Sequence, residues 1–597
     1  MIKFQTLNFE LDLTNKGISL QENSNYFSDS ISKSFSMPFS ISLTGEVAEK
    51  LGLVNINNVS SYANKIYGNV IVDNSFYEGY ISINEIEDTI AELTLFYGKE
   101  VLAVFDKKLI QLPFPVVLAQ GGLPTFAKNQ LTKQWPEATH NFVKIFRPKL
   151  KEETNYEAFD NYLNNYKFNA TTSQWEFPTN SIENVEGVNT ALNKNVMCPM
   201  PYLLEVLRVG FASEGLEMRG DFVNKKLNKK LVLVPKLFFQ QFSESQFSDY
   251  SFSDFTFQET INGNTVNVYK RIHTPTDIGS FTLKMRLNMS NAIARYFHLT
   301  VKQNGVVLYD AFSENKQVII NETLSINIVN TTIYYDIEVE LRLSYQDGSI
   351  ANYNNFKYEY KEGQLNIFPT TYSLADYLPN ITFRDLVNRV KNWQNLRFDY
   401  TDNAVYINYL ENITDDLIYA DKSHLEDPDK KRTLSKQNLF VLKYSGKDDT
   451  EIMVDKTGQI YDKTDFVDAE TEELTLNVTP LEVKENYGTV TGVYPEEETD
   501  IMLTLYDGLI ADEPLSVDNI DNVKLNVQDI FLNFWQKWLK FRANSETYKD
   551  SFTLPVSEVL NIKQGIFKYN KKHLIKSIRK KRISKKLWEV NTESETF

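Results

Sequence analysis

The sequence predicts a multidomain, predominantly β protein that also contains α+β modules. Three observations support this prediction. Aromatic residues make up 13% of the chain, with 33 Tyr and 39 Phe, and aromatic side chains favour strands. Short runs of alternating apolar and polar residues recur along the chain, as in half-buried strands. A length of 597 residues is too great for one hydrophobic core and indicates about three to five domains.

Composition excludes several classes of protein. The single cysteine, Cys198, rules out an internal disulfide and a thiolate metal cluster, and no cofactor is predicted. The opening residues MIKFQTLNFELDL lack the apolar run of a signal peptide, and no stretch is apolar enough to span a bilayer. We therefore expect folding in a cytoplasm without stable membrane insertion. A net charge of −16 argues against general nucleic-acid binding.

Residues 1–112 predict an N-terminal domain built as a β-barrel or a sandwich. Between positions 31 and 43, apolar and serine residues alternate with unusual regularity. The apolar set is Ile31, Phe35, Met37, Phe39, Ile41 and Leu43. Because alternate side chains of a strand point to opposite faces, this stretch predicts one long strand with neighbours on both edges. Further strands are expected at 68–72, 76–83 and 91–96, with a turn at Asp73-Asn74 and a short helix between 98 and 112.

Residues 113–198 predict an irregular connector, in which positions 168–177 around Trp175 have a hairpin pattern. A helix-plus-strand module is expected next, over residues 199–239. Its helix begins after Pro201 and ends before Gly215, a residue type that commonly terminates helices. The apolar face of this helix consists of Leu203, Val206, Leu207 and Phe211.

Residues 240–361 predict an inserted β-sandwich of jelly-roll type. The composition changes there to Ser, Thr, Asn and aromatic residues, with alternating runs at 281–287, 297–301 and 336–343. Gly263-Asn264, Asn304-Gly305 and Asp347-Gly348 supply turns. Such a sandwich either presents loops to partners or glycans, or serves as a structural spacer.

Residues 362–412 predict a second helix-plus-hairpin module. Thr382 and Asp385 have the spacing of a capping box, which starts a helix. The apolar stripe of this helix is Phe383, Leu386, Val387 and Val390, and the opposite face carries Arg384, Arg389 and Lys391. Burial of the four apolar side chains contributes roughly 6 to 12 kcal/mol before entropy. Alternating residues at 396–400 and 405–409 then predict a hairpin with its turn at 401–403.

Residues 413–597 predict a C-terminal β-rich domain, with closing strands at 552–555 and 565–578. Acidic clusters at Asp448-Asp449, Asp455, Glu470, Glu472-Glu473 and 496–498 lack the spacing of a calcium loop, and we interpret them as a solvated face. A helix at 527–541 carries a broad apolar face. Four of its residues form a candidate oligomer interface, with burial in a core as the alternative: Phe531, Phe534, Trp535 and Trp538.

The run 563–586 holds eleven Lys or Arg residues and no acid. We identify a candidate basic docking or lumen surface there: Lys571, Lys572, Lys576, Arg579, Lys580, Lys581, Arg582, Lys585 and Lys586. As a DNA-binding strip, this run would make binding strongly salt-dependent. In so acidic a protein, a docking surface for an acidic neighbour is slightly favoured, and a lumen that passes DNA would combine the two.

Signals of catalysis are weak, and we predict that the protein is not an enzyme. The five histidines are far apart, in unrelated contexts, and no protease, nucleotide-binding or hydrolase motif is present. Cys198 precedes a predicted helix start, where a thiol can be activated, but no histidine lies nearby in sequence. A buried structural cysteine is the favoured interpretation.

Four segments carry a resemblance in pattern and order rather than a strict motif. They are SKSFSMPFSISLTGEVAEKLG (32–52), GNVIVDNSFYEGYISI (68–83), PMPYLLEVLRVGFASEGLEM (199–218) and YKDSFTLPVSEVLNIKQGIFKYNKKHLIKSI (548–578). Together with the unit that begins LPNITFRDLVNRVKNWQNLRFDY, they resemble the hub proteins at the tail tip or baseplate of tailed bacteriophages. The sandwich at 240–361 and the basic C-terminal run depart from the resemblance.

The resemblance implies a structural virion protein, trimeric and assembled in the host cytoplasm. It implies barrel domains that join the tail tube to a spike or fibres and transmit host contact to DNA release. The implied partners are the tube, distal-tail or adaptor, and spike or fibre proteins, with transient contact to passing DNA. Two alternatives remain: a distal-tail or adaptor ring, and a glycan-binding surface protein acting through residues 240–361.

Overall fold

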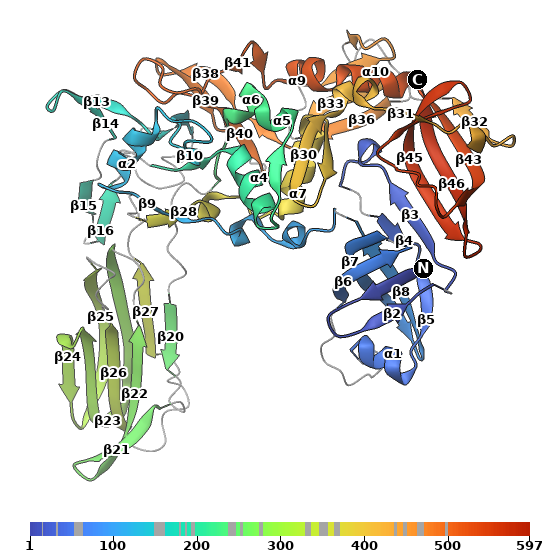
Figure 1. The fold of residues 1–597 in the computed structure, drawn as a ribbon. Helices are drawn as coiled ribbons and strands as arrows, with labels where there is room; N and C mark the ends of the chain where they lie inside the picture. Colours follow the sequence, from blue (N-terminus) through green and yellow to red (C-terminus); the bar gives the residue numbers. More distant parts are fainter. Residues whose placement is uncertain are drawn as a thin grey trace.

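The computed structural model describes most of the chain and confirms a multidomain, predominantly β fold with α+β modules. The described residues are 1–14, 16–31, 34–52, 64–73, 75–98, 100–148, 161–177, 181–185, 188–192, 197–236, 246–250, 255–273, 279–328, 336–345, 356–362, 371–434, 439–445, 451–461, 471–495 and 500–596. The predicted turn at 347–348 and the acidic clusters at 448–449, 470 and 496–498 lie outside them. A central body carries the sandwich at one end and a large sheet, formed by both ends of the chain, at the other (Figure 1).

The sheet at the chain ends, here called the terminal sheet, has fourteen strands. Its order is β2-β1-β6-β7-β8-β4-β3-β45-β46-β43-β32, with β5 on β8, β44 on β45 and β31 on β44. The strands are β1 (Ile2–Gln5), β2 (Glu10–Asp12), β3 (Ser19–Asn23), β4 (Ser34–Ser36), β5 (Phe39–Ser42), β6 (Lys65–Val72), β7 (Ser75–Glu87), β8 (Ile90–Tyr97), β31 (Tyr419–Asp421), β32 (Lys431–Leu434), β43 (Glu546–Pro555), β44 (Gly565–Lys568), β45 (Lys571–Arg582) and β46 (Leu587–Thr596). The N-terminal and C-terminal regions, predicted as separate domains, therefore share one sheet.

The described strands do not close into a barrel, so the barrel expectation is corrected. The reason is the pairing of β3, which lies between β4 and β45 and continues the sheet into the C-terminal strands. The pairing joins Ser19 to Lys581 and Asn23 to Ser577 in antiparallel register. The N-terminal strands therefore do not form a barrel of their own but pair with the C-terminal strands.

The stretch 31–43, predicted as one strand, forms two. β4 and β5 both pair with β8, but the register changes by one residue between Phe35↔Phe96 and Phe39↔Leu93. Met37 and Pro38 lie between the two strands, and proline has no amide hydrogen to donate. The change turns Ser36 inward, where its Oγ accepts a hydrogen bond of 2.9 Å from the Leu95 amide. The predicted short helix at 98–112 consists of two 3₁₀ turns, Ala103–Asp106 and Leu109–Gln111.

Two glycines allow the N-terminal strands to pack closely. Gly68 of β6 and Gly79 of β7 lie directly opposite each other. A Cβ on Gly79 would lie 2.2 Å from the Phe96 carbonyl oxygen, and one on Gly68 would lie 2.5 Å from that of Gln5. Glycine at these positions lets neighbouring strands approach where a side chain would force them apart.

The two helix-plus-strand modules form one unit in the central body. Helix α4 (Leu203–Ala212) leads to β18 (Glu217–Arg219), and helix α7 (Phe383–Trp393) leads to the hairpin β29 (Leu396–Tyr400) and β30 (Ala404–Tyr409). β18 pairs in parallel with β30, which gives the sheet β18-β30-β29. The helices also touch, since a Cβ on Gly210 would lie 2.2 Å from the Phe383 ring. The sandwich is thus inserted between two halves of one fold.

Helix α7 confirms the predicted cap and apolar stripe. The Thr382 Oγ1 accepts a hydrogen bond from the Asp385 amide at 3.1 Å, and the Asp385 carboxylate accepts from the Thr382 amide at 3.3 Å. All four predicted stripe residues are buried. Lys391, predicted on the outer face, is buried as well, and its ammonium group donates to the Ser28 carbonyl. Burial lowers the pKa of Lys391 to about 8, with opposition from nearby Asp29.

The predicted connector packs into the large core of the central body. Its elements are β9 (Val116–Leu118), α2 (Leu123–Gln130), β10 (His140–Asn141), β11 (Ile145–Phe146), β12 (Tyr162–Leu163), β13 (Lys167–Asn169), β14 (Gln174–Glu176), β15 (Ser181–Val185) and β16 (Val188–Leu192). β13 and β14 form the hairpin expected around Trp175. β11 pairs in parallel with β39, which ties this region to the C-terminal half of the central body.

Smaller sheets and helices complete the central body. The strands are β17 (Met200–Pro201), β19 (Leu231–Leu233), β28 (Thr371–Ser373), β33 (Leu439–Tyr444), β34 (Ile452–Asp455), β35 (Ile460–Tyr461), β36 (Thr471–Leu476), β37 (Thr479–Pro480), β38 (Glu482–Asn486), β39 (Thr489–Val493), β40 (Met502–Leu505), β41 (Asn519–Ile520) and β42 (Val523–Lys524). The helices are α5 (Asp221–Asn224), α6 (Lys226–Lys229), α8 (Ile413–Asp416), α9 (Val527–Phe534) and α10 (Gln536–Asn544). α1 (Gly45–Lys50) lies beside the terminal sheet. None of the described helices is long and apolar enough to cross a bilayer.

The eight described strands of the inserted domain, predicted as a sandwich, form one sheet around the long strand β23 (Gly279–Gln303). Its first half pairs with β25 and β27, and its second half pairs with β24 and β26. The register shifts after Met289 in the pairing with β25, and buried residues from both halves of β23 form one core. The other strands are β20 (Gln246–Tyr250), β21 (Phe257–Ile261), β22 (Asn264–His273), β24 (Val306–Ser313), β25 (Lys316–Ile328), β26 (Ile337–Tyr345) and β27 (Phe356–Glu362).

Candidate functional site at the joined chain ends

The predicted basic run folds as strand β45 and the turn that follows it. β45 is an inner strand between β3 and β46, with a bulge between Ile575 and Ser577. Ile575 and Ile578 pack into the core of the terminal sheet. The flanking polar residues face two sides, since Arg579 lies in one depression beside Lys549 while Lys580 lines another beside Trp588. The nine basic residues therefore do not form a single strip.

Acidic residues neutralise four of the nine basic side chains. The ion pairs are Lys571 with Glu546 at 2.6 Å, Lys576 with Glu593 at 3.1 Å, Lys580 with Glu22 at 3.0 Å and Arg582 with Asp73 at 2.6 Å. Two of these acids come from the N-terminal region, Glu22 in β3 and Asp73 after β6, and two from neighbouring C-terminal strands. The basic run contains no acidic residue in sequence, but the fold brings acidic residues from other parts of the chain into contact with four of its basic side chains.

Five of the basic side chains have no ion pair with a described acidic residue. The Lys572 ammonium lies 4.8 Å from the centre of the Tyr419 ring, a cation–π contact. The other four are exposed to solvent: Arg579, Lys581, Lys585 and Lys586. Positive charge is consequently available on both faces of β45 and at the tip of its hairpin with β46.

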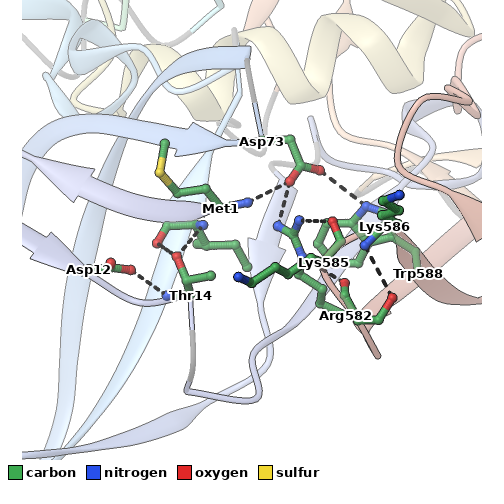
Figure 2. Close-up of polar contacts among 10 residues, drawn as sticks. Met1, Asp12, Thr14, Asp73, Arg582, Lys585, Lys586 and Trp588 are labelled. Atoms are coloured by element: carbon green, nitrogen blue, oxygen red, sulfur yellow. Dashed lines mark hydrogen bonds and ion pairs between the residues drawn. The ribbon is translucent and has the colours of Figure 1, made fainter.

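Asp73 holds the start of the chain to this hairpin, as Figure 2 shows. It follows β6 with a positive φ of 55°, a conformation that Asp tolerates in turns. Its carboxylate accepts hydrogen bonds from Arg582 Nη1 at 2.6 Å, Trp588 Nε1 at 3.3 Å and the Met1 amino group at 2.7 Å. Arg582 also donates through Nη2 to the Lys585 carbonyl at 2.8 Å, which fixes the turn. We call Asp73, Arg582 and Trp588 the clasp.

A groove of about 870 Å³ runs beside the clasp, between the N-terminal strands and the C-terminal hairpin. Its lining includes Leu20, Val72, Tyr77, Tyr97, Leu554, Pro555, Val556, Val559 and Trp588, together with Glu22, Asp73, Glu558, Lys580, Lys585 and Lys586. The Tyr77 and Tyr97 rings are 5.5 Å apart. The groove thus combines an apolar and aromatic lining with charged groups, a composition typical of binding sites.

A second charged cluster joins β32, β43 and β45. The Glu546 carboxylate accepts hydrogen bonds from Arg432 Nε at 2.8 Å and from Lys571 Nζ at 2.6 Å. The bond from Arg432, followed by that from Lys571, lowers the pKa of Glu546 to about 2. The carboxylate therefore stays ionised in mild acid and continues to link the three strands.

The apolar face predicted as an oligomer interface lies inside the chain. The single helix predicted at 527–541 is broken at Trp535 into α9 and α10, and the four interface candidates are at most 7% exposed. Phe534 stacks on Tyr409 at 5.0 Å, and Trp538 lies 5.4 Å from Phe27. These side chains are packed inside the chain, as the alternative interpretation predicts.

The buried histidines and the cysteine occupy structural positions. Burial lowers the pKa of His140 to about 3 and that of His573 to about 4, so both are neutral at physiological pH. The Cys198 thiol is buried, which raises its pKa above the ordinary value. Within the described ranges, no group of three or more His, Cys, Asp or Glu residues could hold a metal ion.

Sequence reasoning identified the basic run but missed its partners. The sequence pattern places Asp73 only in a turn and does not single out Tyr97 or Trp588. The isolated Trp588 in a polar C-terminal stretch was the one available signal. The contact between Asp73 and Trp588 spans 515 positions, a separation over which local patterns carry no information.

The sequence matches no protein-family model and no curated protein. Among solved structures, the chain is similar to the 43 kDa tail protein of prophage MuSo2 from Shewanella oneidensis, with 8% identity, a TM-score of 0.18 and coverage of 54% of this chain and 97% of the other. It is also similar to a tail protein from Neisseria meningitidis MC58, with 7% identity, a TM-score of 0.19 and coverage of 55% and 96%. A family 35 carbohydrate binding module from an environmental isolate shows 11% identity, a TM-score of 0.11 and coverage of 22% and 93%.

Proposed function

We propose that this chain is a structural protein of a bacteriophage tail. In this proposal it forms the hub that joins the tail tube to the tail tip or spike and transmits host contact to DNA release. Two of the similar solved structures are tail proteins, which agrees with the proposal. Their TM-scores are below 0.2, so this structural similarity does not serve as evidence for it. The support comes from the terminal sheet and from the segments that carry the resemblance.

The terminal sheet is the observation on which the proposal depends. Three of the five resembling segments, 32–52, 68–83 and 548–578, supply strands to this one sheet although they are far apart in sequence. A resemblance whose parts meet in space describes a folded unit rather than scattered similarity. The sheet also ties the two chain ends together, which suits a protein that passes mechanical load between neighbours.

The ends of the sheet suit assembly with other subunits. Among the described strands, its path ends at β2 on one side and at β32 on the other. Every residue of β32 is exposed, and unpaired strand edges can accept a strand from a neighbouring chain. Since the aromatic helix face is buried, we assign subunit contacts to these edges. We retain the trimer as the proposed assembly, with tube, adaptor and spike or fibre proteins as partners.

The absolute mass of the purified protein tests self-assembly. Light scattering over a range of concentrations should give three times the 69.2 kDa of the chain. A hexamer or larger ring would transfer the proposal to an adaptor or distal-tail position. A monomer at every concentration would contradict self-assembly of the hub.

The proposal makes the protein structural rather than catalytic. Tail-associated proteins can also degrade cell walls, and such an activity would produce clearing in a peptidoglycan zymogram. We expect no clearing from the folded full-length chain, with lysozyme as the positive control. Clearing by the pure protein would contradict this part of the proposal.

One observation favours glycan binding by the sandwich as a second function. Phe312 is 58% exposed, and its ring meets Tyr296 at 5.5 Å and His298 at 5.8 Å. The His298 imidazole lies 2.6 Å from the Asp310 carboxylate, so an aromatic platform adjoins hydrogen-bonding groups. A glycan panel probed with the full-length chain tests this function, and Phe312→Ala should abolish any signal. Absence of binding across host polysaccharides would contradict it.

A further inference from the structure

We propose that the groove beside the clasp binds an extended segment of a partner protein that carries both acidic and apolar side chains. The inference rests on the chemistry of the groove and does not depend on the tail role. Three observations define the occupant: an unpaired buried hydroxyl, two unpaired lysines and an exposed apolar rim.

The hydroxyl belongs to Tyr97. Its side chain is 3% exposed and lines the groove, and its oxygen has no hydrogen-bond partner among the described residues. A buried hydroxyl without a partner costs about 1 to 3 kcal/mol, so such groups are rare in native proteins. This oxygen is closed off from solvent in the free groove, so a bound segment would satisfy it only if the lining side chains shift.

The charge of the groove selects an acidic occupant. Its carboxylates already have partners, because Glu22 binds Lys580 at 3.0 Å and Glu558 binds Lys422 at 2.7 Å. The Asp73 carboxylate is likewise held by Arg582 in the clasp. Lys585 and Lys586 also line the groove, and neither forms an ion pair with a described residue. The free charge facing a ligand is therefore positive.

The rim and lining call for apolar side chains in the same occupant. Val559 is 76% exposed and Leu587 is 36% exposed, and both line the groove with Leu554. Exposed apolar residues next to an apolar lining are typical of protein-binding surfaces. A nucleic acid fits less well, because its phosphates would meet only two free lysines beside several carboxylates. An extended peptide can alternate apolar side chains into the groove with acidic ones toward the lysines.

Fluorescence anisotropy with the full-length protein tests the proposal. The probe is a fluorescein-labelled peptide of about ten residues in which Leu and Glu alternate. A Ser–Glu peptide removes the apolar groups, a Leu–Lys peptide reverses the charge, and a single-stranded DNA of similar length supplies phosphate. The Leu–Glu peptide should bind at least about tenfold more tightly than each of these. Equal or tighter binding of DNA, or no binding of the Leu–Glu peptide, would overturn the proposal.

Two charge-reversed variants locate the binding. The double variant Lys585→Glu/Lys586→Glu places acids in the groove and should weaken binding of the Leu–Glu peptide about tenfold or more. The matched control is Arg579→Glu/Lys581→Glu, which makes the same change in net charge on exposed positions that do not line the groove. It should alter affinity less than about threefold. Equal effects of the two variants would mean non-specific attraction and would reject the groove.

The variant Tyr97→Phe distinguishes an effect of the hydroxyl on peptide binding from an effect on the stability of the fold. Removal of an unpaired buried hydroxyl should leave the thermal midpoint unchanged or higher, because the free protein loses an unsatisfied group. The same change should weaken binding of the Leu–Glu peptide about threefold to tenfold if the peptide supplies the missing partner. Unchanged affinity in a stably folded variant would contradict the role assigned to this hydroxyl.

Discussion

At the scale of single residues, Asp73 does most to join the two ends of the chain. It binds Arg582 and Trp588 across more than 500 sequence positions. The Asp73 side chain is 21% exposed and that of Arg582 is 16% exposed, so the pair is partly shielded from water. Hydrogen bonds between ionised groups are stronger than neutral ones, and shielding increases their contribution.

We predict that Asp73→Asn lowers the free energy of unfolding by about 1 to 2 kcal/mol. Asparagine tolerates the positive φ of this position, so the change isolates the loss of charge. Asp12→Asn is the matched control, because Asp12 contacts only its near neighbour Thr14 among the residues drawn in Figure 2, and it should change stability by less than about 0.5 kcal/mol. Urea unfolding followed by tryptophan fluorescence measures the free energy of unfolding of both variants. Equal losses of stability would contradict a special role for the clasp.

Glu546 should make the terminal sheet sensitive to acid. Its pKa in the fold is about 2, below the ordinary value of 4.5, because Arg432 and Lys571 bind the charged form. A carboxyl group whose pKa is lower in the fold than in the unfolded chain adds to the free energy of unfolding. This contribution is fully present above pH 4.5 and is lost as the pH falls toward 2. The stability difference between the wild type and Glu546→Gln should therefore shrink over that interval. A difference that stays constant from pH 6 to pH 2 would contradict this assignment.

Local chemistry made some residue-level predictions possible. The cap of α7 depends on Thr382 and Asp385, which are three positions apart, and the spacing alone revealed it. The same helix periodicity placed Lys391 on the outer face, yet residues 26–29 of the N-terminal region cover it. Periodicity identifies which residues share a face, but only the tertiary fold decides whether a distant segment covers that face.

At the scale of elements, the alternation of apolar and polar residues predicts most strands and helices, but it does not predict where they are broken. β6, β7 and β8 contain the predicted strands and extend them by one to four residues at one or both ends. The stretch 31–43 alternates throughout, but Pro38 and a register change divide it. The helix at 527–541 is divided at Trp535, whose φ of −126° departs from helical geometry while its side chain packs in the core. Packing in these cases overrides the periodic signal.

The aromatic face of α9 and α10 supports a second mutational test. Trp538→Ala should lower the free energy of unfolding by about 3 to 5 kcal/mol, because it opens a cavity in the core. Leu532→Ser is the control from the same region, since Leu532 is 43% exposed, and it should cost less than about 0.5 kcal/mol. Calorimetry and light scattering on both variants separate the two roles. A Trp538→Ala protein that is stably folded but no longer oligomerises would instead support an oligomer interface at this face.

At the scale of the whole molecule, the sequence revealed the parts but not how they join. The two helix-bearing modules were predicted from separate patterns, and their common sheet through β18 and β30 was not. The pairing of β3 with β45 likewise links segments more than 550 residues apart. Neither pairing leaves a local signal, because the strands involved would have the same pattern with any partner.

This architecture predicts that the sandwich can be removed. Replacement of residues 237–370 by a flexible linker of about twenty residues should leave the central body folded, because α4, β18, α7 and β30 contact one another directly. The shortened protein should keep a cooperative thermal transition and the oligomeric state of the full chain. Aggregation or loss of the transition would show that the sandwich is required for the central fold.

The central claim is that the chain is a tail hub, and its location in a virion is the most direct test. Antibodies raised against the purified protein should label intact particles of the phage or prophage that encodes it. Gold-labelled secondary antibody viewed by electron microscopy should lie at the tail end distant from the capsid, at the junction of tube and tip. Labelling elsewhere on the particle, or particles that lack the chain altogether, would contradict the claim.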